Sequence, residues 1–138
     1  MYVKVNYRDG ARFEVEAGKH RIICDQPADN GGHDQGMTPP ELLLSSLGTC
    51  AGYYAYRYLS TRKLPAAGLT VYVTAEKDTS PARLSRFRVE VETEPLSDKH
   101  RDGLLRAVQS CLIHNTLLHA PEIAVDHITI LAEIPCCG

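Results

Sequence analysis

The sequence predicts an α+β protein in which helices pack against antiparallel strands. Two groups of short segments alternate apolar and polar residues, as half-buried strands do, and a long apolar helix separates the two groups. A turn signal, Asp9-Gly10 in the first group and Ser80-Pro81 in the second, connects neighbouring strands as a hairpin. The predicted order is β-β-β-α-β-β-α-β in a single domain over residues 1–138.

The length and composition favour one globular domain. The chain has 138 residues, of which 43% are hydrophobic and 23% are charged, so it is long enough to bury a core and too short for two ordinary domains. The formal net charge is -2, and the basic and acidic residues are mixed along the sequence. These features exclude a disordered chain and argue against a nucleic-acid partner.

Residues 1–24 are predicted to form three strands. A hairpin precedes a third strand over His20–Cys24. The segment from Asp25 to Pro40 is rich in glycine and proline, which predicts a loop, and loops of this length are often functional.

The central helix is predicted over residues 38–63 and contains Cys50. Thr38 and Glu41 have the spacing of a capping box, with Pro39 at the first helical position. Its longest uncharged stretch, 42–56, is too short for a bilayer span, so no membrane partner is expected. Because the helix is apolar on nearly every side, we expect a second copy of the chain to cover it, giving an intertwined homodimer.

Three further elements complete the prediction. Two long strands are expected within residues 69–94, and a second helical region within 97–120 begins at a Ser97 or Asp98 cap. Periodicity places Cys111 on the apolar face of that helix. A final strand is expected over 123–134.

The five cysteines favour free, catalytic or metal-binding thiols over structural disulfides. No secretory signal is visible at the N-terminus, so we expect a cytoplasmic location. Cys24 is interpreted as a packing residue, and Cys136 and Cys137 as a frayed end or a mobile dithiol. Cys111 and His114 have a ligand spacing, but without a second pair we expect no metal, and no cofactor is predicted.

The pair Cys50 and Cys111 has two interpretations. Cysteines on apolar helices are usually inert packing residues. If the fold brings the two sulfurs together, however, they can act as a redox pair, in which one thiolate is oxidised to a sulfenic acid and the other condenses with it to a disulfide. The spacing of 61 residues does not decide between these alternatives.

Two segments of the chain resemble the signatures of the OsmC/Ohr family. Pro39–Cys50 resembles the first signature, a proline followed by an acidic-aliphatic helix start and small residues that end in cysteine. Cys111–Leu117 resembles the second. The resemblance implies antiparallel sheets wrapped around two central helices of an interlocked homodimer. It also implies reduction of organic hydroperoxides, with Cys50 as the peroxidatic and Cys111 as the resolving cysteine, and an external dithiol as reductant.

The sequence departs from the peroxidase branches at several positions. Pro40 stands where those branches have a glutamate that orients a catalytic arginine. Glu41 is a possible supporting residue, although a role as a helix-capping group is the more ordinary interpretation. Leu112 replaces the proline that commonly follows the second cysteine. Three arginines of the N-terminal strands lie outside any matching motif: Arg8, Arg12 and Arg21.

These departures place the chain closer to the OsmC-like branch and leave two functional hypotheses. The first is a thiol-dependent peroxidase that reduces organic hydroperoxides through Cys50 and Cys111. The alternative is a non-enzymatic or very slow OsmC-like dimer that binds a small apolar ligand.

Overall fold

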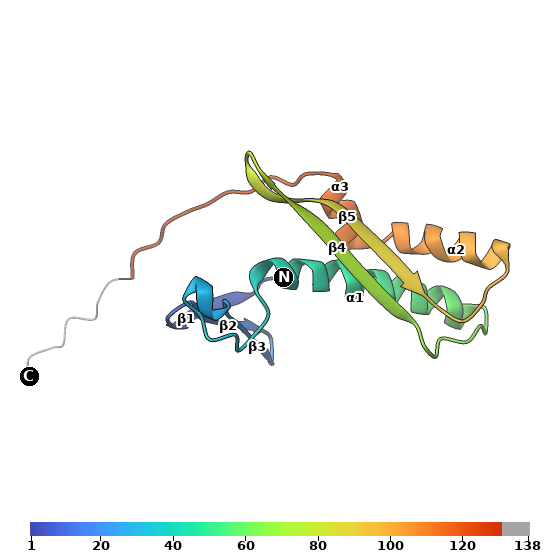
Figure 1. Cartoon of the computed structure of the whole chain (residues 1–138), viewed down its shortest axis with the longest axis horizontal. Helices are drawn as coiled ribbons and strands as arrows, with labels where there is room; N and C mark the ends of the chain where they lie inside the picture. Colours follow the sequence, from blue (N-terminus) through green and yellow to red (C-terminus); the bar gives the residue numbers. More distant parts are fainter. Residues whose placement is uncertain (131–138) are drawn as a thin grey trace, which may run out of the picture.

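The computed structural model describes residues 1–130, and it confirms the α+β class with antiparallel sheets (Figure 1). The N-terminal sheet has the strand order β1-β2-β3, with β1 over Lys4–Asp9, β2 over Arg12–Ala17 and β3 over His20–Cys24. Both pairings are antiparallel, as the predicted hairpin requires. This sheet lies beside the first turns of the central helix in Figure 1.

The loop after β3 is ordered by a buried carboxylate. Asp25 is 0% exposed and accepts hydrogen bonds from the backbone N–H groups of Gln26, His33 and Gln35. A short 3₁₀ helix, η1 (Ala28–Asn30), lies within the loop. The loop therefore folds back on Asp25 and delivers the chain to the start of the next helix.

The central helix, α1, spans Pro39–Thr61, and its predicted start is confirmed. The Glu41 carboxylate accepts hydrogen bonds from the backbone N–H and the hydroxyl of Thr38, both at 2.8 Å. One side of α1 is buried against the remaining elements, whereas Leu43, Tyr53 and Tyr56 on other parts of its surface are 38%, 55% and 51% exposed. Within one chain, the apolar surface of this helix is only partly covered.

The second sheet and two further helices enclose the core. The strands β4 (Thr70–Thr79) and β5 (Ala82–Glu92) form an antiparallel pair that lies across α1 (Figure 1). The helix α2 (Asp98–Gln109), which Ser97 caps as predicted, packs beside α1. The buried core lies between α1 and α2 and comprises Ala51, Ala55, Tyr58, Leu59, Leu104 and Val108.

The prediction of a continuous helix through Cys111 is wrong. The helix α2 ends at Gln109, and a separate helix, α3, begins at Leu112 and ends at Leu118. Cys111 is the residue that connects them, with extended dihedral angles of φ -61° and ψ 136°. Cys111 therefore caps α3 instead of lying on the apolar face of α2.

The predicted final strand does not form in the part of it that the structure describes. Residues 121–130 have no regular secondary structure, and all of them are exposed. Figure 1 shows this segment running away from the helices and sheets. A strand requires a hydrogen-bonding partner, and the two sheets of the described residues include no residue of this segment. Residues 131–134, the rest of the predicted strand, lie outside the described residues.

Among residues 1–130, no helix combines the length and the apolar content that a bilayer crossing requires.

Candidate active site

Cys50 and Cys111 come from different elements and meet at the packing of α1 against the α2–α3 junction. Cys50 lies in the middle of α1 and is half-buried, and Cys111 is 0% exposed. The Cys50 side chain lies close enough to Cys111 to raise the pKa of its thiol. Both are free cysteines.

The surroundings of Cys111 favour its protonated form. Burial raises the pKa of the Cys111 thiol, and the neighbouring Cys50 thiol raises it further. The backbone N–H groups of His114 and Ile113, in the first turn of α3, act in the opposite direction but do not outweigh burial. Because a thiolate is the attacking species, its raised pKa makes Cys111 a poor nucleophile for a first attack on a substrate. Cys50 is the more accessible of the two sulfurs.

Glu41 is engaged at the start of α1, nine residues before Cys50. The hydrogen bonds from the backbone and then the hydroxyl of Thr38 hold the pKa of Glu41 below its usual value. At a rise of about 1.5 Å per residue, the two backbone positions are separated by ~13.5 Å along the helix axis. The contacts of Glu41 with Thr38 therefore support a role in helix capping and not a role at the thiols of the same chain.

The N-terminal arginines are likewise engaged within their own sheet or exposed. Arg8 pairs with Glu14. Arg12 pairs with Asp9 at 2.5 Å and also hydrogen bonds to Gln35. The third, Arg21, is exposed in β3. None of these contacts joins an arginine to Cys50 or Cys111.

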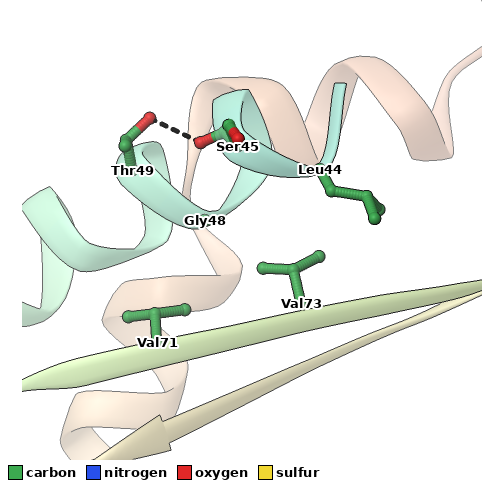
Figure 2. Close-up of a pocket in the computed structure, with 6 residues that line it drawn as sticks. All are labelled: Leu44, Ser45, Gly48, Thr49, Val71 and Val73. Atoms are coloured by element: carbon green, nitrogen blue, oxygen red, sulfur yellow. Dashed lines mark hydrogen bonds between the residues drawn. The ribbon is translucent and has the colours of Figure 1, made fainter. Parts of the chain in front are cut away.

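A first hollow lies between α1 and β4 and is lined by small and β-branched side chains (Figure 2). Its volume is about 420 Å³, and its lining residues are Leu44, Ser45, Gly48, Thr49, Val71 and Val73. In Figure 2 the two valines extend from β4 toward the helix at Gly48. A Cβ atom added at Gly48 would lie 3.0 Å from Val73 Cγ2, so this glycine allows the close approach of strand and helix. Neither thiol lines this hollow.

A second hollow, of about 480 Å³, lies between α1, β5, α2 and α3. Its walls are apolar except for Gln109 and His114. The Nδ1 atom of His114 is buried and has no hydrogen-bond partner among the described residues. The apolar lining residues are Leu47, Ala51, Leu84, Phe87, Val89, Val91, Leu105, Val108, Leu117 and Leu118.

The second hollow is not among the features predicted from the sequence. A signal was present in the alternation of Phe87, Val89 and Val91, which places three apolar side chains on one face of β5. The hollow has the size and polarity of a small-ligand pocket, and Ala51, the residue after Cys50, contributes to its wall.

The remaining cysteines do not line either hollow in the described part of the chain. Cys24 is 7% exposed at the end of β3, and burial, followed by the charge of Asp25, raises its pKa, which fits the predicted packing role. Cys136 and Cys137 lie outside the described residues. Among residues 1–130, no group of three or more His, Cys, Asp or Glu side chains is placed to hold a metal ion.

Comparison with known proteins relates the chain to one family. The family model described as OsmC-like protein matches residues 32–126. No curated protein matches the sequence.

Solved structures share the fold. A Psychrobacter arcticus protein, described as a candidate osmotic stress induced and detoxification response protein, has a TM-score of 0.75 at 25% identity, over 83% of this chain and 85% of that one. An OsmC like protein from Mycoplasma pneumoniae has a TM-score of 0.74 at 21% identity, over 86% and 87% of the two chains. An organic hydroperoxide resistance protein OsmC from Legionella pneumophila has a TM-score of 0.60 at 14% identity, over 86% and 88%.

Proposed function

Because the chain belongs to the OsmC-like protein family, we propose that it is a thiol-dependent peroxidase that reduces organic hydroperoxides through Cys50 and Cys111. The main support for the proposal is the proximity of the two thiols: Cys50 is half-buried on α1, and Cys111 beside it is fully buried. Family neighbours that are organic hydroperoxide resistance proteins support the same substrate class.

The reaction divides into two steps that use the two thiols differently. The Cys50 thiol loses its proton, and the thiolate attacks the terminal peroxide oxygen, so that an S–O bond forms and the O–O bond breaks. The departing alkoxide takes up the proton that the thiol lost and leaves as an alcohol, and Cys50 becomes a sulfenic acid. The Cys111 sulfur then attacks the resulting sulfenic acid, a disulfide forms and water leaves. An external dithiol supplies two electrons and two protons to restore both thiols. The raised pKa of Cys111 suits this order, because it disfavours Cys111 as the first nucleophile.

The proposal is tested by peroxide consumption with an organic hydroperoxide and dithiothreitol. We expect Cys50→Ser to lower consumption to the rate measured without protein. Without reductant, the Cys111→Ser variant should stop at a Cys50 sulfenic acid that dimedone labels, whereas the wild type should form the internal disulfide and escape labelling. Cys24→Ser removes another buried cysteine and serves as the matched control, with activity close to wild type. Undiminished turnover by Cys50→Ser contradicts the proposal.

A second candidate function is supported by the apolar hollow between α1, β5, α2 and α3. A non-enzymatic or very slow protein would use this space of about 480 Å³ to bind a small apolar ligand. In that case the reduced protein would react with the hydroperoxide no faster than free cysteine does. Binding of an apolar fluorescent probe would then be unchanged in Cys50→Ser and weakened by Leu105→Asp, since Leu105 lines the hollow.

We further propose that the protein functions as an intertwined homodimer. Apolar side chains are exposed on the N-terminal sheet, including Val5 at 56% and Tyr7 at 64%, and on α1. The segment 121–130 carries further exposed apolar residues and has no partner strand within the described part of its chain. A second copy could cover these surfaces and pair with this segment.

A further inference from the structure

A basic cleft lies between the C-terminal end of α1 and α2. Its volume is about 550 Å³, and its lining residues are Tyr58, Arg62, Lys99, His100, Gly103, Arg106, Ala107 and Ser110. Three of these side chains, Arg62, Lys99 and Arg106, are cationic, and none is a carboxylate. The positive charge of the cleft contrasts with the formal net charge of the whole chain, which is -2.

The two acidic residues of α2 form ion pairs with Arg101, which lies outside the cleft. Arg101 pairs with Asp98 at 3.0 Å and with Asp102 at 3.3 Å, and none of the three lines the cleft. Among the described residues, no carboxylate forms an ion pair with Arg62, Lys99 or Arg106. The three cations of the cleft are therefore available to an anionic ligand.

Several contacts hold the cleft in shape. The Arg62 guanidinium lies over the Tyr58 ring, 3.8 Å from its centroid, and donates a hydrogen bond to Thr61 Oγ1 at 3.2 Å. The Tyr58 hydroxyl and His100 Nδ1 are hydrogen-bonded at 3.2 Å. A Cβ atom at Gly103 would lie 2.1 Å from the same hydroxyl, so the two helices approach as closely as a glycine allows. The contact with Tyr58 therefore orients the Arg62 guanidinium before any ligand binds.

An aromatic hollow adjoins the cleft. It has a volume of about 320 Å³, shares Tyr58, Arg62 and Ala107 with the cleft, and adds Tyr53, Tyr54, Arg57 and Thr61. A ligand whose anionic group lies among the cations could therefore place an organic group against tyrosine rings. Arginine presents several donors to phosphate oxygens, and tyrosine supplies a broad apolar surface with a polar end.

We propose that this cleft binds a small phosphate monoester, with the phosphate among Arg62, Lys99 and Arg106 and the organic group beside the tyrosines. Neither Cys50 nor Cys111 lines the cleft or the adjoining hollow. The proposal is therefore independent of the thiol chemistry.

The test measures binding of inorganic phosphate and phenyl phosphate to the full chain by titration calorimetry at constant ionic strength. We expect phenyl phosphate to bind more tightly than inorganic phosphate, and chloride not to compete. Arg106→Gln should weaken phosphate binding about tenfold, the effect of losing one charged hydrogen bond. The more conservative Arg62→Lys should weaken it less than Arg62→Gln, which also loses the charge.

Arg101→Gln is the matched control, because Arg101 lies on α2 outside the cleft. Its affinity should equal that of the wild type, and so should the affinity of Cys50→Ser, whatever the outcome of the peroxide assay. Equal losses in Arg106→Gln and Arg101→Gln would overturn the site, as would heats no larger than those of chloride. Tighter binding of inorganic phosphate than of phenyl phosphate would overturn the assignment of a monoester.

Discussion

Asp25 illustrates how one buried carboxylate orders a loop that contains little regular structure. Although burial alone would raise its pKa, the backbone N–H groups of Gln26, Gln35 and His33 together hold the pKa of Asp25 below its usual value. Gly32 completes the packing around this carboxylate. A Cβ atom at Gly32 would lie 1.8 Å from the carbonyl oxygen of Gln26, so the loop can close only on a residue without a side chain.

We expect Asp25→Asn to lower the urea midpoint of unfolding, because an amide replaces the charged acceptor of three backbone donors. The lowered pKa means that the carboxylate stabilises the fold above the unfolded value of about 3.9 and loses this contribution as the pH falls through its folded pKa. The deficit of the variant should therefore be full at pH 7 and shrink at lower pH. Asp29→Asn, in the exposed part of the same loop, should leave the midpoint unchanged.

The residues of the site differ in how far the sequence could predict them. Cys50 and Cys111 were identified because each lies within a segment that resembles a family signature. Asp25 carries no comparable signal, since a single aspartate before a glycine-rich loop has no periodicity and its three donors become partners only when the loop closes. The same limit applies to the basic cleft, which joins residues from two helices 37 positions apart at Arg62 and Lys99.

At the scale of elements, the packing of α1 on α2 depends on Gly103. The Tyr58 hydroxyl occupies the place of a side chain at this position, 2.1 Å from the Cβ atom that any other residue would add. Glycine in a helix interior weakens the helix, so its presence in α2 needs a packing reason, and this contact provides it.

We expect Gly103→Ala to destabilise the protein by about 1–3 kcal/mol, because Tyr58 or α2 must move to make room. Gly52→Ala is the matched control within α1. Its Cβ atom would meet Val71 Cγ2 at an ordinary 3.6 Å, so the helix-propensity gain of about 0.5–1 kcal/mol should dominate and stabilise the fold. Thermal or urea unfolding measures both. A destabilised Gly52→Ala together with a neutral Gly103→Ala would contradict this account.

Local signals predicted some elements better than others. The hairpin turns and the capping box of α1 depend on neighbouring residues, and they are found where the sequence indicated. The break between α2 and α3 was missed because the apolar periodicity of Leu104, Val108, Cys111 and Leu112 continues across it. The pattern is compatible with one helix, whereas Cys111 has extended dihedral angles and separates two helices that both pack against α1.

At the scale of the whole molecule, large apolar side chains remain exposed in a single chain. They include Val5 and Tyr7 of β1, Tyr53 and Tyr56 of α1, and Ile128 in the segment after α3. The proposed homodimer would cover such surfaces and would give residues 121–130 the partner strand that they lack within the described part of the chain.

The proposed homodimer leads to a prediction about Ile128 and Ile130, which are 86% and 92% exposed in the single chain. If pairing with a second copy buries them, replacing both with aspartate removes at least about 3 kcal/mol of apolar burial, or more than a hundredfold in the dissociation constant. Sedimentation across a dilution series should show a dimeric wild type and a dissociating variant. Thr129→Asp, on the opposite side of an extended segment, should dissociate far less. A wild type that sediments as a monomer at every concentration would contradict the homodimer, whereas equal dissociation of the two variants would show that this segment contributes charge sensitivity without an apolar contact.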